Sequence, residues 1–123
     1  MGNNLLTYTK TATIAVSGTT SGPVELEDYE MIGLHIPALD SSTLKLQVNA
    51  DPASPPGSGT WYDVYDGLGN QILNLPASTG SRYVATRDLA DILGAHWVRV
   101  VCGSAQNSAA RTFTFYLRGA KRT

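Results

Sequence analysis

The residues that could bind a metal are two histidines and a short acidic turn. A metal site needs several His, Cys, Asp or Glu side chains at ligand spacing, but His35 and His96 lie far apart and neither has a second ligand nearby. Asp63, Asp66 and Asn70 together would suit calcium. Their spacing is not that of an EF-hand loop, however, and an Asp-Gly pair is ordinary turn chemistry. We therefore predict no metal site and no cofactor.

Motifs for nucleophilic or phosphate chemistry are missing from the sequence. No serine sits in a G-x-S-x-G elbow, and no glycine-rich loop carries the Walker lysine. The carboxylates of Glu25 and Glu27 lie on a predicted loop with nothing to raise a pKa. Cys102, the only cysteine, lies in an apolar segment. That placement favours a buried, inert thiol over an intermolecular disulfide or a catalytic thiol, so we predict that the protein is not an enzyme.

Three aromatic residues close together could bind a sugar. Trp61, Tyr62 and Tyr65 could form a platform on which a sugar ring stacks. Aromatic residues at this spacing more often pack against neighbouring strands. The sequence therefore leaves sheet packing and glycan binding open, and it favours packing.

Charge and hydropathy narrow the range of partners. The formal net charge is −1, and the basic residues are scattered except near the end of the chain, so we expect no specific binding to nucleic acid. No stretch approaches the roughly 18 apolar residues of a membrane span. Residues 1–7 have neither a basic start nor a long apolar run, and Leu6 replaces the Ser or Thr of a myristoylation signal. We expect synthesis in a cytoplasm.

The side chains above are positioned by segments in which apolar and polar residues alternate, the pattern of a half-buried strand. With 123 residues, of which 42% are hydrophobic, the chain suits one domain. We predict about eight short strands in an all-β, antiparallel two-sheet sandwich, with jelly-roll and immunoglobulin-like topologies both open. One short helix is expected over 88–94. The predicted strands cover 11–16, 24–26, 31–36, 44–48, 62–65, 71–75, 82–86, 96–102 and 111–118.

The ends and the longest loop are the candidate contact segments. Residues 1–10 form either a frayed terminus or an arm that adds a strand to a neighbour, 11–119 form the sandwich, and 120–123 are a basic tail. The loop over 51–59, with three prolines, is a contact loop or a hairpin tip. An acidic cluster is either a solvated loop or a patch for the basic tail of a neighbouring copy. Its members are Glu25, Glu27, Asp28 and Glu30, and the basic residues are Arg118, Lys121 and Arg122.

Three segments resemble a class of small virion proteins of tailed bacteriophages. They are GLHIPALDSSTLKLQVNAD, TWYDVYDGLGNQI and HWVRVVCGSAQNSAARTFTFYLR. In that class a G-L-x-I-P-A strand precedes L-x-x-Q-V-S-x-D, then W-x-D-x-Y-D with a glycine-rich turn, then a tryptophan-bearing strand and R-x-x-x-x-x-L-R. The one departure is Asn49, where the class has Ser. The matching positions are Gly33 to Ala38, Leu44 to Asp51, Trp61 to Asp66, Trp97 to Ser104 and Arg111 to Arg118.

The resemblance implies a β-sandwich that coats or completes a phage particle. We expect a capsid decoration (cement) protein, a homotrimer at capsomer junctions on the capsid surface of the virion, with the major capsid protein and copies of itself as partners. The alternative is a glycan- or receptor-binding module of a head fibre or tail. The residues expected to contact partners are Leu5, Leu6, Tyr8, Pro52, Pro55, Pro56, Arg118, Lys121 and Arg122.

Overall fold

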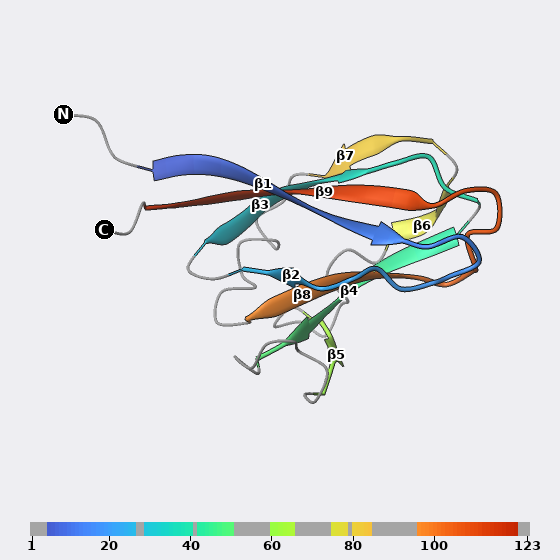
Figure 1. Cartoon of the computed structure of the whole chain (residues 1–123), viewed down its shortest axis with the longest axis horizontal. Helices are drawn as coiled ribbons and strands as arrows, with labels where there is room; N and C mark the ends of the chain where they lie inside the picture. The colour runs from blue at the N-terminus through green and yellow to red at the C-terminus, as the bar shows by residue number, and fades with distance from the viewer. Residues whose placement is uncertain are drawn as a thin grey trace.

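Alternating side chains form β-strands along much of the chain (Figure 1). The computed structural model describes residues 5–26, 29–40, 42–50, 60–65, 75–78, 80–84 and 96–120. The all-β class is confirmed for these residues, and the helix predicted over 88–94 lies outside them. The strands are β1 (Leu5–Ile14), β2 (Val24–Glu25), β3 (Glu30–Ile36), β4 (Ser42–Asn49), β5 (Tyr62–Asp63), β6 (Leu75–Ser78), β7 (Arg82–Val84), β8 (Trp97–Cys102) and β9 (Arg111–Ala120).

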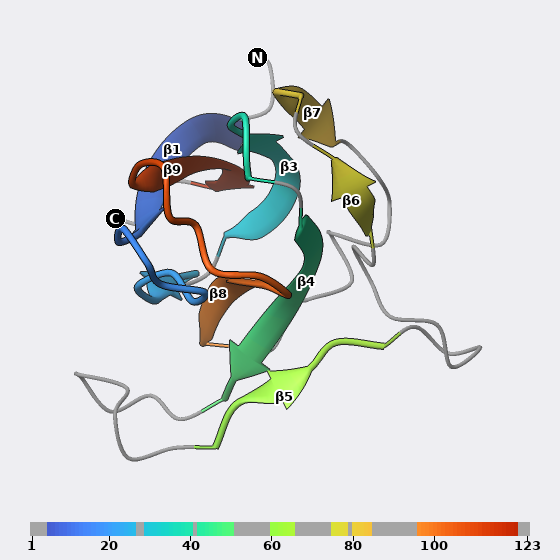
Figure 2. The same ribbon diagram turned by 90° about the vertical axis from the view of Figure 1, so that its right-hand side faces the viewer.

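The strands form two antiparallel sheets (Figure 2). The first sheet has the order β1-β9-β3-β7, and the second has the order β2-β8-β4-β5 with β6 also paired to β4. Early strands pair with late ones: β1 with β9, β2 with β8, β3 with β7 and β4 with β5. With β6 set aside, this nested order is that of a jelly roll. The predicted two-sheet sandwich is confirmed, and the jelly roll is the topology observed.

The core lies between the sheets and consists of the inward-facing residues of the long strands. On β9, Phe113, Phe115 and Leu117 are fully buried, whereas Thr112 and Arg118 are exposed. This is the alternation expected of a strand with one face on a core. β3, β4 and β8 supply further buried residues: Met31, Leu34, Ile36, Leu44, Leu46, Val98 and Val100. On β3 the register shifts between Met31 and Gly33, so Met31 and Leu34 are both buried although they are three residues apart.

The first strand begins earlier than the sequence predicts. Residues 1–10 are predicted as an arm, yet β1 begins at Leu5 and pairs with β9 from Leu5 opposite Ala120 to Ile14 opposite Arg111. The arm assignment is therefore wrong for the part of the segment that the structure describes. The physical reason is that the last strand is long enough to satisfy the backbone of the first along its whole length.

The end of the first strand also differs from expectation. The strand predicted over 11–16 stops at Ile14, and Val16 is 56% exposed rather than turned into the core. Ser17 has a φ of 69°, in the left-handed region, and the amide of Gly18 donates to the carbonyl of Ala15 at 2.8 Å. A tight turn therefore replaces the last residues of the predicted strand.

At β6 the sequence predicts a turn where the structure has a strand. A turn is predicted over 76–81, but β6 covers Leu75–Ser78 and pairs with Leu44 and Ser42 of β4. The strand predicted over 71–75 lies outside the described residues except for Leu75, which is in β6. Pro76 is tolerated because β6 is a short strand at the edge of its sheet. By contrast, β3 ends at Ile36, directly before Pro37, as predicted.

The burial of β9 leads to a stability prediction. Replacing Phe115 with Ala removes a fully buried ring and leaves a cavity, so we expect a loss of about 3–5 kcal/mol in the free energy of unfolding. The matched control is Thr11→Ala on the exposed phase of β1, for which a change within about 0.5 kcal/mol is expected. Urea unfolding monitored by circular dichroism measures both. Equal losses for the two variants would contradict the assigned inward phase.

Candidate interaction surfaces

The predicted N-terminal contact residues are used within the chain. Leu5 and Leu6 pair in register with Ala120 and Gly119 at the end of β9. The ring of Tyr8 packs against that of Tyr29, with centroids 4.6 Å apart. The start of β1 and the end of β9 therefore lie at the same end of the molecule (Figure 1). We call this surface the terminus end and define it by Tyr8, Lys10, Glu25, Tyr29, Glu30, His96 and Arg118.

Charged groups of the terminus end pair with one another. The Arg118 guanidinium donates to Oε1 of Glu30 at 2.8 Å, and Nε2 of His96 lies 2.7 Å from Oε2 of Glu25. Glu30 and Arg118 therefore pair within one chain, and the contact of Arg118 with a neighbouring copy stays a prediction. These partly exposed pairs set geometry more than stability. Glu27, Asp28, Lys121 and Arg122 lie outside the described residues, as do Pro52, Pro55 and Pro56.

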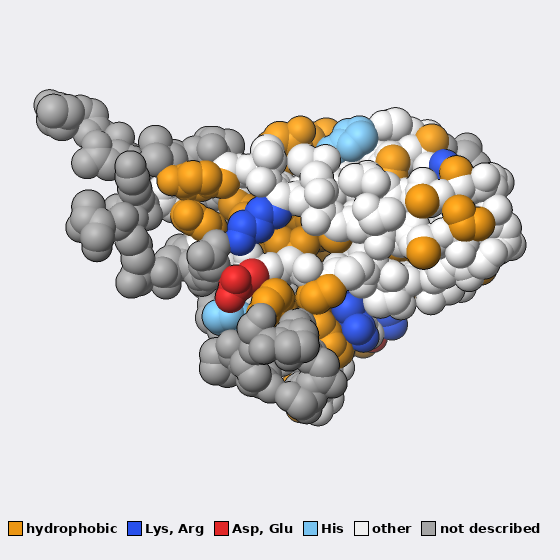
Figure 3. All heavy atoms as spheres, in the orientation of Figure 1, with side chains coloured by type: hydrophobic (Ala, Val, Ile, Leu, Met, Phe, Trp, Pro, Cys, Tyr) orange, Lys and Arg blue, Asp and Glu red, His pale blue; other side chains and the backbone are white. Residues whose placement is uncertain are grey.

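Lys10 and Glu25 join the two sheets at the terminus end. The Lys10 ammonium donates to the backbone carbonyl of Glu25 at 2.7 Å and lies 5.9 Å from the centroid of the Tyr29 ring. The amide of Leu26 in turn donates to the carbonyl of His96 at 2.9 Å. These contacts connect β1, β2 and the start of β8. Figure 3 shows acidic, basic and histidine side chains close together on this face, whereas the surface to their right is mostly uncharged.

A row of polar side chains crosses the outer face of the second sheet. The Lys45 ammonium lies 3.1 Å from Oδ2 of Asp63, Gln47 donates to Oδ1 of Asp63 at 2.9 Å, and Nε of Arg99 donates to Oε1 of Gln47 at 2.8 Å. We call these four residues the polar ladder. The Arg99 guanidinium also stacks over the Trp61 ring at 4.2 Å, a favourable cation–π contact. The ladder connects β8, β4 and β5 across the sheet.

Beside the ladder, the predicted aromatic platform divides into two parts. Trp61 is half-buried and packs under Arg99, so it serves the sheet. Tyr62 and Tyr65 are 63% and 54% exposed. Of the three residues of the predicted platform, the two tyrosines are therefore more exposed than the tryptophan, and Tyr62 lies opposite Val48, on the face away from the ladder.

Another exposed tyrosine lies on the outer face of the first sheet. Tyr83 covers Gly33 so closely that a Cβ there would collide with the Tyr83 hydroxyl. Its ring also meets that of Tyr116 edge to face, with centroids 5.3 Å apart. Tyr83 is thus exposed but held in place by its own sheet.

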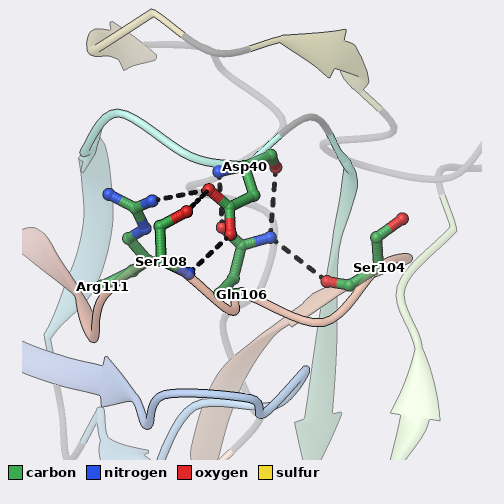
Figure 4. Close-up of polar contacts among 5 residues, drawn as sticks. All are labelled: Asp40, Ser104, Gln106, Ser108 and Arg111. Carbon is green, nitrogen blue, oxygen red and sulfur yellow. Dashed lines mark hydrogen bonds and ion pairs between the residues drawn. The ribbon is translucent and has the colours of Figure 1, made fainter.

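Several loops are connected by Asp40 and Gln106 (Figure 4). The Asp40 carboxylate accepts from the amide and hydroxyl of Ser108, at 2.9 and 2.7 Å, and from the Arg111 guanidinium at 3.0 Å. The buried Gln106 side chain accepts from the Asp40 amide at 2.8 Å and donates to the carbonyls of Asp40 and Ser104 at 3.2 Å. We call these five residues the Asp40 clasp. It joins the loop after β3 to the loop before β9.

The clasp changes the ionisation of its carboxylate. The Ser108 hydroxyl bond, followed by the Ser108 amide bond, holds the pKa of Asp40 below its ordinary value of 3.8. The amide of Asn107 and the positive charge of Arg111 act in the same direction. Hydrogen bonds to the charged form favour it, so the clasp is built for an ionised Asp40.

The groups with metal-binding or nucleophilic potential lie apart. His35 contacts the Ser81 hydroxyl at 3.0 Å, and the described residues contain no group of three or more potential metal ligands. Cys102 is buried and free, and burial raises the pKa of its thiol. The interpretation as a buried thiol without an internal disulfide is confirmed. Among the described residues no helix has the length and hydropathy to cross a membrane.

The sequence patterns do not single out three residues whose side chains have defined places in the structure: Lys10, Arg82 and Arg99. Each lies within an otherwise apolar or alternating strand, and this interruption is the signal that could have found them. Lys10 has the same phase as Ala12 and Ile14, and Arg99 interrupts the run from Trp97 to Cys102.

Comparison with known proteins identifies no relative of the chain. No protein-family model matches it, and no curated protein sequence matches it significantly. The function is therefore proposed from the fold, the surfaces described above and the resemblance of its motifs.

We expect the Asp40 clasp to make stability pH-dependent. Because the pKa of Asp40 is lowered on folding, its ionised form stabilises the protein above the unfolded value of 3.8, and this contribution is lost as the pH falls through the folded value. Asp40→Asn should be less stable than wild type near neutral pH, and the difference should shrink in acid. Urea unfolding midpoints over a pH series measure this.

The matched variant is Ser108→Ala, which removes the hydroxyl donor and keeps the carboxylate. We expect it to shift the acid loss of stability to higher pH. A difference between Asp40→Asn and wild type that is the same at all pH values would contradict the assigned role of the carboxylate.

Proposed function

We propose that the chain is a structural protein of a phage virion, a capsid decoration protein that binds at capsomer junctions and stabilises the head. The observation that carries the proposal is the jelly-roll order of the strands, an architecture that recurs in viral capsid domains. It agrees with the resemblance of the motifs to small virion proteins. One fold hosts many functions. Further support for the proposed function therefore has to come from the surfaces of the protein.

The terminus end is the surface that we assign to shell contact. It combines partly exposed charges of both signs, Glu30 and Arg118, with the aromatic pair of Tyr8 and Tyr29. Charged pairs on a contact surface favour the correct orientation and partner more than they add affinity. The low share of charged residues, 15%, also suits a subunit that neighbours partly cover.

A decoration protein acts by mass action. Each copy that binds the closed shell and not the dispersed subunits lowers the free energy of the shell, by an amount set by concentration and affinity. A stable contact of this kind buries on the order of 800 Å² per partner, which requires faces and loops rather than a pocket. We propose the major capsid protein and two further copies of this chain as the partners.

A second candidate function is favoured by the exposed tyrosines. Tyr62 and Tyr65 are each more than half exposed, on β5 and two residues after it. Tyr62 lies opposite Val48, on the face of the sheet away from the polar ladder. Exposed aromatic rings suit sugar recognition. Jelly rolls also serve as lectin domains. Under this proposal the chain is a glycan- or receptor-binding module of a head fibre or tail.

The decoration function predicts a gain in shell stability. Purified full-length protein added to phage shells that lack it should bind saturably and raise the temperature at which the shells open, as measured by sedimentation and calorimetry. Arg118→Ala should weaken binding while changing folding stability by less than about 1 kcal/mol, since its ion pair is exposed. Lys45→Ala, on the outer face of the second sheet, is the matched control. Shells that neither bind the protein nor gain stability would rule the function out.

For the glycan-binding function, the expected result is binding to one or more sugars on a glycan array. Tyr62→Ala and Tyr65→Ala should abolish these signals, because each removes an exposed ring. Tyr83→Ala removes an exposed ring from the other sheet and should leave them unchanged. An array without signals, or signals that depend equally on Tyr83, would count against glycan binding by this surface.

A further inference from the structure

Both edges of the first sheet carry a cation on the side that faces the core. β1 and β7 are the outer strands of that sheet (Figure 2). Lys10 of β1 lies opposite Phe115, and Arg82 of β7 lies opposite Ile36. Directly opposed residues share a face of the sheet, and Phe115 and Ile36 are fully buried. The two charged side chains thus project inward at the two margins of the sandwich.

At one edge of the first sheet, Lys10 links β1 to the second sheet. Its ammonium donates to the Glu25 carbonyl of β2, the edge strand of the second sheet. Further along, the Gly22 amide lies 3.4 Å from the Thr13 carbonyl of β1. A strand added beside this part of β1 would have to displace both contacts.

Arg82 occupies the other margin without an evident stabilising role. Its Nε and Nη2 atoms are buried and have no hydrogen-bond partner in the part of the chain that the structure describes. A buried donor without a partner destabilises a fold. Val84, on the same phase, packs against the core as an apolar residue would. Stability therefore does not account for an arginine at position 82.

We propose that Lys10 and Arg82 guard the two edges of the first sheet against pairing with a strand of a second copy of this chain. Exposed sheet edges are templates for strand addition, and inward-pointing charges are one of the ways proteins prevent it. In an antiparallel pairing of β1 with β1 of another copy, the added strand would bring a second Lys10 toward the first. Like charges facing each other across strands are unfavourable.

The edges of the second sheet agree with this assignment. Its outer strands β2 and β5 span only two residues each, and short strands offer few backbone groups to a partner. Of these four outer strands, β1 and β7 each carry an inward-facing cation, and β2 and β5 are each only two residues long. Among the strands that the structure describes, β6 is the remaining edge, and it is short and carries Pro76, which cannot donate to an added strand. This inference is independent of the proposed role in a phage head.

The test compares full-length variants by sedimentation velocity over a concentration series, with thioflavin T fluorescence as a second readout. Lys10→Met and Arg82→Met should form larger species at about tenfold lower concentration than wild type, the effect of one or two net hydrogen bonds. Lys45→Met is the matched control, because it removes a cation from β4, which has strand partners on both sides. Lys10→Arg and Arg82→Lys keep the charge and should behave as wild type.

Arg82→Met also distinguishes a guard from a stabilising residue. Its melting temperature should equal or exceed that of wild type while its self-association increases. A lower melting temperature for Arg82→Met would overturn the proposal for Arg82. For either residue, a Met variant that sediments like wild type at every concentration would overturn it, as would Lys45→Met associating as readily as the edge variants.

Discussion

The fold depends on the burial of the last strand. β9 lies between β1 and β3, and its Phe113, Phe115 and Leu117 are all fully buried. Because the last strand occupies the middle of the first sheet, the chain must close on itself, with each early strand paired to a late one. Most pairings therefore join residues far apart in sequence, and the start of β1 lies beside the end of β9 at the terminus end.

Polar contacts connect loops and strands that pack around the hydrophobic core. The Asp40 clasp holds the loops that flank β4 and β9, the Lys10–Glu25 contact joins the two sheets, and the polar ladder crosses the second sheet. Each joins segments that are far apart in sequence through hydrogen bonds or ion pairs at the margin of the core or on the outer face. Among the described residues, the exposed large apolar side chains are Val16 and three tyrosines, Tyr62, Tyr65 and Tyr83. A protein of this kind is suited to contact through its surface.

Local patterns predict the strands better than their arrangement. β4 and β9 follow from the alternation of apolar and polar residues, and β3 and β8 follow from their high content of apolar residues. The start of β1 is missed because its stability comes from Ala120 and Gly119 at the far end of the chain, and most of β6 is missed because Pro76 indicates a turn. Arg118 is predicted as a contact residue from the basic tail, but its partner Glu30 is visible only once β3 and β9 are paired. Long-range pairing of this kind leaves no local signal.

The central claim is that this jelly roll binds the outside of a phage head by a surface at its terminus end. Electron cryomicroscopy of particles assembled with and without the chain tests it most directly. We predict additional density at the capsomer junctions that accommodates the two sheets, with the start of β1 and the end of β9 turned toward the shell. Identical heads in the two samples, or density confined to the tail, would contradict the account.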